Sequence, residues 1–176
     1  IIMHGLFGMS DNWQSLAKKW ASEFTVHLLD MRNHGRSPHS DAFSYQLMTD
    51  DLLEYMNDKD LAKAAILGHS MGGKVAMLFS VFYPEKVERL IVADIGPKAY
   101  RPHHQEVLEA LNGLDLSSVK SRKEATEAFG PKLEFGVKQF LLKNLYWEEK
   151  DKLAWRFNLR VLAREIVKVG ESLAPN

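Results

Sequence analysis

Cysteine is absent from the 176 residues, which excludes disulfide scaffolds, cysteine nucleophiles and metal sites built from thiolates. An excess of charge is absent too, because 23 basic and 23 acidic side chains cancel. No net field therefore draws the chain to nucleic acid or to an anionic membrane. No apolar run reaches the roughly 18 residues of a membrane-spanning helix, and no signal-peptide pattern is visible. We expect a cytoplasmic protein, monomeric or homodimeric, without nucleic-acid or integral membrane contact.

Over the first 94 residues, short apolar runs alternate with segments of helical periodicity. The runs predict strands at residues 1–3, 25–30, 63–68 and 89–94, the last two as buried strands. The helices between them are predicted at residues 10–24, from residue 44 onward and at residues 72–83. Ser10 or Asp11 is expected to cap the first helix, and Ser44 the second. This alternation requires a parallel sheet with right-handed crossovers, so the fold class is α/β.

The pattern changes after Asp94, where no strand-like run follows. Helices are predicted at residues 103–112, 121–129, 133–145 and 159–171. A helical block placed after a sheet strand is typical of a cap or lid over the strand ends. We therefore divide the chain into a core segment, residues 1–94, and a helical cap segment, residues 95–176.

The most informative motif is Gly-x-Ser-x-Gly, formed here by Gly68, His69, Ser70, Met71 and Gly72. It lies directly between a predicted strand and a predicted helix, the context in which this pattern carries a nucleophilic serine. The serine then occupies a strained turn, and side chains in place of Gly68 or Gly72 would collide with the packed strand and helix. The Met71 N–H and the positive end of the following helix favour an oxyanion. The alternative is a tight turn in which the serine is incidental.

A second loop, His4-Gly5-Leu6-Phe7-Gly8, follows the first predicted strand. Acyl transfer needs two N–H donors on the tetrahedral oxygen, one after the nucleophile and one from a neighbouring loop. We expect the Leu6 N–H to be the second donor, with Phe7 as the alternative. The place of His4 before Gly5 suggests that it shapes the loop. Without the serine motif, an ordinary glycine turn would explain the same residues equally well.

Five segments, in this order, resemble those of a known family: HGLFGMSDNW, LLDMRNHGRSP, GHSMGGKVAM, VADIGP and WRFN. They are similar to the α/β-hydrolases, specifically to the YbfF-like branch of acyl esterases and thioesterases, from Ile1 to about Asn158. The resemblance implies a mostly parallel sheet with helices on both faces. The four predicted strands become family strands three to six, with Ser70 after the fifth and an α-helical cap after the sixth. Family strands one, two, seven and eight are expected to be missing from this chain.

The resemblance also implies a catalytic acid after the sixth strand, where Asp94 stands. The alternative for Asp94 is a structural one, as a cap for the turn that follows it. The catalytic histidine of the family follows the eighth strand, and none of the seven histidines here occupies that place. We therefore expect the general base to lie outside this chain.

The histidines of the chain are expected to have other roles. His69 adjoins Ser70, but neighbouring side chains diverge at such a turn, so it is a poor base and supports the turn. His34 is assigned a mainly structural role. The pair His103-His104 could begin a metal site, but no third ligand is apparent, so no metal is expected.

These motifs together predict a serine hydrolase of small-molecule carboxylic esters or acyl thioesters, working through an acyl-enzyme on Ser70. No metal or organic cofactor is required. Another reaction on the same fold, by a C–C bond hydrolase or a cofactor-free haloperoxidase, would use nearly the same residues. From a different class, a non-catalytic interaction module could retain the serine turn. An aromatic-rich group between Phe129 and Trp147 could line an acyl pocket or simply pack in a core.

Overall fold

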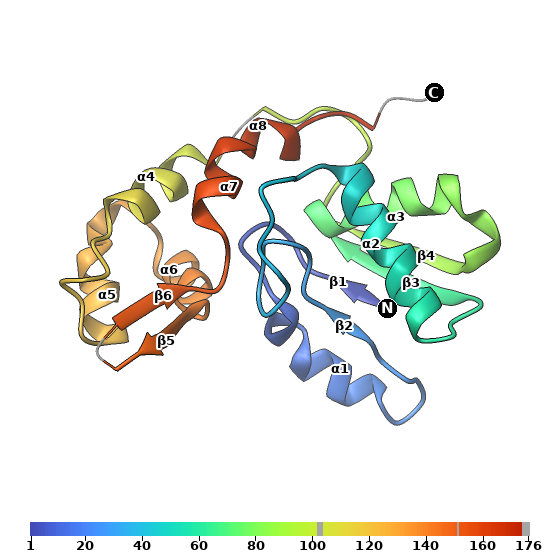
Figure 1. Cartoon of the computed structure of the whole chain (residues 1–176), viewed down its shortest axis with the longest axis horizontal. Coiled ribbons are helices and arrows are strands. Elements are labelled where there is room, and N and C mark those ends of the chain that lie inside the picture. Colours follow the sequence, from blue (N-terminus) through green and yellow to red (C-terminus); the bar gives the residue numbers. More distant parts are fainter. Residues whose placement is uncertain (102–103, 151, 174–176) are drawn as a thin grey trace.

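A computed structural model describes residues 1–101, 104–150 and 152–173 of the chain. Figure 1 shows two parts, one with the strands β1 to β4 and one with the helices α4 to α6, and α7 and α8 lie between them at the top of the view. The four strands of the first part are β1 (Ile2–Met3), β2 (Leu28–Leu29), β3 (Ala64–His69) and β4 (Val87–Ala93). They form one sheet in the order β2-β1-β3-β4, and every pair is parallel. The expected α/β class is confirmed.

The register of the sheet aligns the strand ends that matter for a site. Met3 pairs with Gly68, and His69 pairs with Ala93. The carboxyl ends of β1, β3 and β4 therefore lie close to one level, and the loops after them meet at the same edge. In open parallel sheets this edge carries the ligand site.

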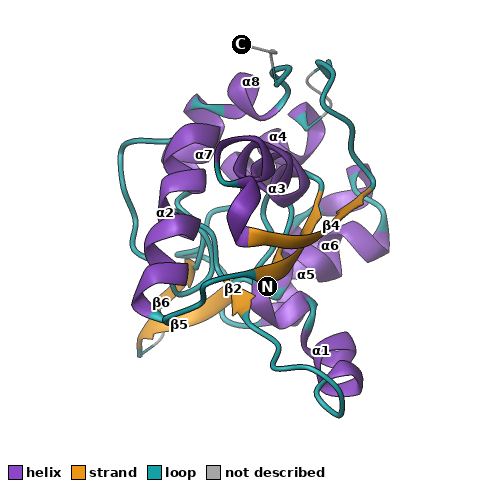
Figure 2. Cartoon of the chain, turned by 90° about the vertical axis from the view of Figure 1, so that its right-hand side faces the viewer, coloured by secondary structure: helices purple, strands orange, loops and turns teal. Residues whose placement is uncertain are grey.

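Two helices cover one face of the sheet. The 12-residue α3 (Met71–Phe82) packs against β1, β3 and β4, and α2 (Tyr45–Asp58) packs alongside α3. Figure 2 shows these helices together, with α1 (Gln14–Trp20) below the sheet in that view. A short 3-10 helix, η2 (Pro84–Lys86), follows α3, as expected from the proline there. Ser44 caps α2, because its side chain accepts from the Leu47 N–H at 3.2 Å, as predicted.

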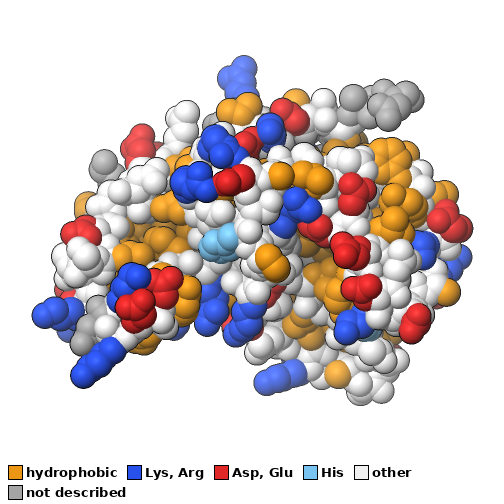
Figure 3. Space-filling model, in the orientation of Figure 1, with side chains coloured by type: hydrophobic (Ala, Val, Ile, Leu, Met, Phe, Trp, Pro, Cys, Tyr) orange, Lys and Arg blue, Asp and Glu red, His pale blue; other side chains and the backbone are white. Residues whose placement is uncertain are grey.

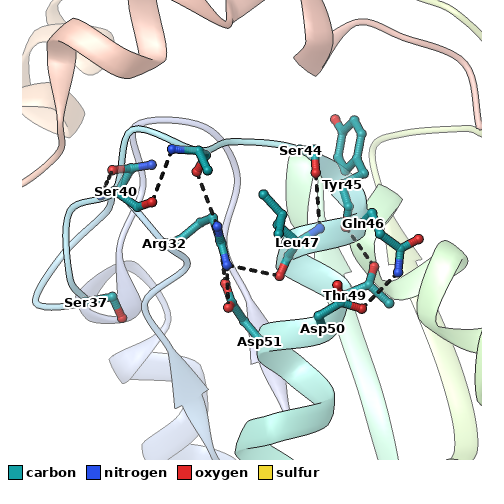
Figure 4. Close-up of polar contacts among 12 residues, drawn as sticks. Arg32, Ser37, Ser40, Ser44, Tyr45, Gln46, Leu47, Thr49, Asp50 and Asp51 are labelled. Atoms are coloured by element: carbon teal, nitrogen blue, oxygen red, sulfur yellow. Dashed lines mark hydrogen bonds and ion pairs between the residues drawn. The ribbon is translucent and has the colours of Figure 1, made fainter.

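The beginning of α2 is also tied to the loop after β2. The Arg32 guanidinium forms two hydrogen bonds with the Asp51 carboxylate, at 2.6 and 2.7 Å, and reaches the Leu47 carbonyl at 3.4 Å (Figure 4). Paired bonds of this kind fix geometry as well as adding energy. Because the Asp51 side chain is 38% exposed, the stabilisation is modest and the main effect is to hold the loop in place.

The first helix differs from the expectation. Neither Ser10 nor Asp11 caps a helix that runs to residue 24; instead a 3-10 helix, η1 (Ser10–Asn12), precedes α1, which ends at Trp20. The cause is local hydrogen bonding that holds a tight turn. The Ser10 N–H donates to Asp30 Oδ1 at 2.6 Å, and the Asn12 side chain accepts from the Met9 N–H at 2.7 Å.

The prediction that residues 89–94 form a buried strand is wrong. Within the described residues β4 is the outer strand of the sheet, with Leu90 40% and Ile91 50% exposed. Val81 and Phe82 of α3 are exposed beside it, and apolar side chains gather on this side of the molecule, at the right of Figure 3. An apolar sequence indicates a tendency toward burial, but only a neighbouring element can bury it.

The prediction of no strand after Asp94 is also wrong. The elements of this part are α4 (Gln105–Gly113), α5 (Arg122–Ala128), η3 (Gly130–Lys132), α6 (Phe135–Leu142), β5 (Leu145–Glu149), β6 (Lys152–Trp155), α7 (Leu159–Arg164) and α8 (Ile166–Val169). The strands β5 and β6 form an antiparallel pair, with Leu145 opposite Trp155. Leu145 and Leu153 face the core, whereas Glu148 pairs with Lys152 at 2.6 Å on the outside. Cross-strand partners, rather than a strong local pattern, create this hairpin.

The segment that follows β4 lies beside the segment that follows α8. The Tyr100 N–H donates to the Gly170 carbonyl and the Leu173 N–H donates to the Pro97 carbonyl, both at 2.8 Å. The buried Lys74 of α3 donates from Nζ to the Glu171 carbonyl, and burial lowers the pKa of this amine. The two connections to the second part therefore run side by side and are fixed to α3 through Lys74.

Candidate active site

Ser70 lies between the last residue of β3 and the first residue of α3. Its backbone has φ 50° and ψ −118°, a conformation that costs a non-glycine residue about 1–3 kcal/mol. The surrounding bonds impose it: the Ser70 N–H donates to the Ala93 carbonyl of β4 at 3.0 Å, and its carbonyl accepts from Gly73 and Lys74. Strain held in this way projects the side chain away from the sheet at the strand ends. The Ser70 hydroxyl has no hydrogen-bond partner among the described residues.

The two glycines of the motif are required by contact distances. A Cβ on Gly68 would lie 2.1 Å from the Gly72 carbonyl oxygen, and one on Gly72 would lie 2.6 Å from backbone oxygens of Met3 and His4. No side chain relaxes such overlaps, because the opposing atoms are backbone. The closeness also brings the start of α3 against the end of β1, so the loop after β1 reaches Ser70. A Cβ on Gly5 would lie 3.1 Å from Ser70 Cβ.

The loop after β1 is held by polar contacts that, among the described residues, engage the Phe7 and Gly8 N–H groups but not the Leu6 N–H. The Phe7 N–H donates to His34 Nε2 at 3.2 Å, and the Gly8 N–H donates to the Gly5 carbonyl at 2.9 Å. The Phe7 carbonyl accepts from the Asn144 side chain at 2.9 Å. Within the described part of the chain the Leu6 N–H has no partner. Of the two alternatives for the second oxyanion donor, Phe7 is therefore engaged elsewhere and Leu6 is available.

Two buried histidines, both with neutral imidazole rings, hold this loop in place. His4 donates from Nδ1 to the Gly5 carbonyl and accepts at Nε2 from the Met31 N–H. His34 donates from Nδ1 to the Arg32 carbonyl, which leaves Nε2 to accept from Phe7. Burial lowers the pKa of His4 to about 4 and that of His34 to about 3. Both rings therefore act as fixed hydrogen-bond partners near neutral pH, in agreement with the structural roles expected for them.

Asp30 anchors the same region from the end of β2. Burial raises the pKa of the Asp30 carboxyl, but the N–H groups of Ser10 and Arg36 donate to it and outweigh burial, so its pKa is lowered. The ionised carboxylate thus binds the turn that leads to α1. Asp30 does not belong to the described lining of the Ser70 cleft, and in this role it is a structural anchor.

Asp94 stands at the end of β4, one strand away from the serine. It is exposed, its backbone has φ 56°, and its carboxylate has no hydrogen-bond partner among the described residues. The His69–Ala93 pairing sets Ser70 and Asp94 at the same level of neighbouring strands.

The other expected site residues have clear places. The Met71 N–H lies at the start of α3, where the first amides of a helix have no partner within it. The ring of His69 lies 6.2 Å from the ring of Trp13, and His69 lines the same cleft as Ser70. His103 lies outside the described residues. Across the ranges 1–101, 104–150 and 152–173, no group of three or more potential ligands could hold a metal ion.

A cleft of about 470 Å³ opens at Ser70, between the two parts of the molecule. Its lining combines the loop after β1, Ser70 and His69, the pair Trp13 and Leu16, and, from the second part of the chain, Phe140 of α6 and His104. A larger hollow of about 530 Å³ runs along β2, beside Asp30 and Tyr55. The smaller cleft is the candidate site because it alone of the two contains Ser70.

Sequence reasoning did not identify two residues of this site, and it left the role of a third open. Trp13 ends the segment HGLFGMSDNW, so its place in that segment was an available signal. Asn144 is a polar residue in an apolar stretch, and it is fully buried, which marks a polar residue held by specific partners. Phe140 belongs to the aromatic-rich group whose role was left open, and the structure places it in the cleft wall.

A serine on a strained strand-to-helix turn, above a parallel sheet and beside a glycine loop, defines the nucleophile-elbow class of α/β folds. Within the described residues, no helix is both long and apolar enough to cross a membrane.

Comparisons with known proteins agree with this class. The sequence profile of the alpha/beta hydrolase fold family matches residues 1–135. Esterase YbfF from Escherichia coli (strain K12) is 36% identical over 164 residues, which cover 92% of this chain and 63% of that protein. The sn-1-specific diacylglycerol lipase ABHD11 from Mus musculus is 37% identical over 178 residues, which cover 96% of this chain and 58% of that protein.

A solved structure described as a marine microorganism esterase is 39% identical, with a TM-score of 0.95, and the match covers 99% of this chain and 69% of that chain. The chain belongs to the α/β-hydrolase family, and the expected resemblance to the YbfF-like esterase branch is confirmed. It spans 58–63% of the length of the two curated relatives.

Proposed function

We propose that the native protein carrying this chain is a serine hydrolase of carboxylic esters or acyl thioesters, with Ser70 as the nucleophile. Asp94 holds a histidine contributed by another part of the native protein, and that histidine accepts the Ser70 proton. The N–H groups of Leu6 and Met71 bind the oxyanion. The cap assigned to residues 95–176 covers the substrate. Neither a metal nor an organic cofactor takes part.

One observation carries the proposal: Ser70 sits on a strained turn, and the N–H groups of Leu6 and Met71 have no partner among the residues that the structure describes. A serine that served only as a turn residue would need neither the strain nor the free donors. Donors fixed before the reaction cost no reorganisation when charge develops, which is why such sites lower the barrier. The names of the relatives, an esterase and a diacylglycerol lipase, support an ester as the substrate class.

The reaction has two balanced steps. Ser70 Oγ bonds to the acyl carbon as its proton passes to the histidine, and the carbonyl oxygen becomes the bound oxyanion. The bond to the alcohol or thiol then breaks, and the histidine gives its proton to this leaving group. Water repeats the sequence on the acyl-enzyme, releasing the carboxylic acid and restoring the Ser70 hydroxyl.

Rapid-mixing hydrolysis of p-nitrophenyl butyrate by the native protein tests this function. We expect a burst of nitrophenol equal to the enzyme concentration, followed by slower turnover, because the acyl-enzyme forms before water releases it. The Ser70→Ala variant should lose the burst and about 10⁶-fold in kcat. Butyryl-CoA, assayed with a thiol reagent, extends the test to thioesters. An active Ser70→Ala variant would contradict the proposal, and a native protein without burst or turnover would favour the interaction module.

A further inference from the structure

The wall of the cleft on the β1 side is made by Trp13, at the junction of η1 and α1. Its backbone is fixed on both sides, because its N–H donates to the Ser10 carbonyl at 3.0 Å and its carbonyl accepts from the Ala17 N–H at 2.9 Å. Ser10 is in turn bound to the Asp30 carboxylate. The backbone of Trp13 is therefore fixed at the edge of the cleft, and Trp13 is one of the residues that line it.

The indole of Trp13 also stands next to the nucleophile. Its ring packs on His69, the residue before Ser70, at 6.2 Å between centroids. The lining also includes Phe140 of α6. No Lys, Arg, Asp or Glu side chain belongs to the described lining, so the cleft suits an uncharged, apolar group.

The order of the strands decides which half of an ester occupies this space. The sheet runs β2-β1-β3-β4, with Ser70 after β3, Trp13 on the β1 side and Asp94 on the β4 side. The leaving group takes its proton from the base that Asp94 holds, so it must lie toward β4. The acyl group then extends the opposite way, toward β1 and the indole.

Resting on the function proposed above, we propose that Trp13 is a specificity-determining residue that limits the length of the acyl chain. The preferred substrates then carry short, unbranched, uncharged acyl groups. In this proposal Phe140 of α6 also contacts the acyl group. It does not set the limit on acyl-chain length, because it belongs to the second part of the molecule and not to the segment that carries Trp13.

The test compares kcat/KM for p-nitrophenyl acetate, butyrate, hexanoate, octanoate and decanoate, using the native protein and its Trp13→Ala variant. One methylene in an apolar pocket is worth about tenfold or more, so Trp13→Ala should raise the decanoate-to-acetate ratio by at least about tenfold. Trp20→Ala is the matched control: Trp20 ends the same helix and does not line the cleft, so the ratio should stay that of the native protein. Trp13→Phe should give an intermediate ratio, and it carries the test if Trp13→Ala does not fold.

A second series uses acetate esters of alcohols of increasing length. It shows whether the acyl group or the leaving group lies against Trp13. Trp13→Ala should leave this series unchanged, and a shift here instead of in the acyl series would overturn the assignment. An unchanged acyl series in both Trp13 variants would overturn the length limit itself. Labelling of Ser70 by a fluorophosphonate separates the two failures: labelled variants with the native length profile refute only the role of Trp13, whereas an unlabelled, inactive native protein refutes the hydrolase.

Discussion

The two sides of Ser70 differ sharply in how complete they are. On the β1 side, the loop from His4 to Gly8 is buried and is held by hydrogen bonds to His34 and Asn144, among others. On the β4 side, Asp94 is exposed and has no partner among the described residues. The side proposed to bind the oxyanion is held by fixed hydrogen bonds, whereas the side proposed to transfer the proton is open to solvent.

Burial explains the difference. A buried N–H without a partner costs about 1–3 kcal/mol, so a buried loop must satisfy its donors, and Leu6 is left free only where a ligand can reach it. An exposed carboxylate such as Asp94 is satisfied by water and needs no fixed partner. In the proposed function, the oxyanion half is therefore held by buried contacts within this chain, including the long-range ones from His34 and Asn144, whereas the proton-transfer half needs a further side chain.

The largest effect is expected on the open side. Asp94→Asn should lower kcat for ester hydrolysis by about 10⁴-fold, because the amide cannot hold the histidine in the required tautomer. The exposed Asp58 at the end of α2 provides the control, and Asp58→Asn should leave kcat unchanged. If Asp94→Asn instead lowered the melting temperature while kcat stayed the same, Asp94 would be a cap for the turn that follows β4.

The two buried histidines on the β1 side should make the free energy of unfolding depend on pH. His4 and His34 have pKa values of about 4 and 3 in the folded chain, below the unfolded value near 6.5, so the unfolded chain binds more protons between these limits. Their contribution to stability is present above pH 6.5 and is lost as pH falls from 6.5 toward 4. Each histidine should contribute about 1.4 kcal/mol per pH unit to the slope.

Urea unfolding of the native protein at pH 7, 6 and 5 measures this slope. His34→Gln keeps an amide donor and acceptor and should reduce the slope by the share of one histidine. His39→Gln, at an exposed position, should leave it unchanged. A native protein whose stability is flat between pH 6.5 and 5 would show that the two rings are not buried as neutral groups.

The smallest effect is expected where the second part of the chain supports the oxyanion loop. Asn144→Ala removes the hydrogen bond to the Phe7 carbonyl, so the Leu6 N–H should shift and kcat should fall by about 10–100-fold with KM unchanged. Asn112→Ala, at an exposed position of α4, is the control. The contrary outcome is a variant that unfolds more easily and regains native kcat at lower temperature. That result would indicate that Asn144 acts in folding only.

Local patterns in the sequence predict much of the core and of the serine turn. The spacing of Gly68, Ser70 and Gly72 is a local demand of the strand-to-helix turn, so it is visible without knowledge of the fold. The link from Asn144 to Phe7 joins residues 137 positions apart, and no local pattern reveals such a contact. The hairpin of β5 and β6 and the exposure of β4 depend in the same way on which elements become neighbours.

The most direct measurement is the intact mass of the native protein before and after treatment with a fluorophosphonate, followed by peptide mapping. An activated serine beside an oxyanion site should give one adduct per chain, on the peptide that contains Ser70, and Ser70→Ala should give none. No adduct under conditions that label a known serine hydrolase, or an adduct confined to another serine, would contradict Ser70 as the nucleophile.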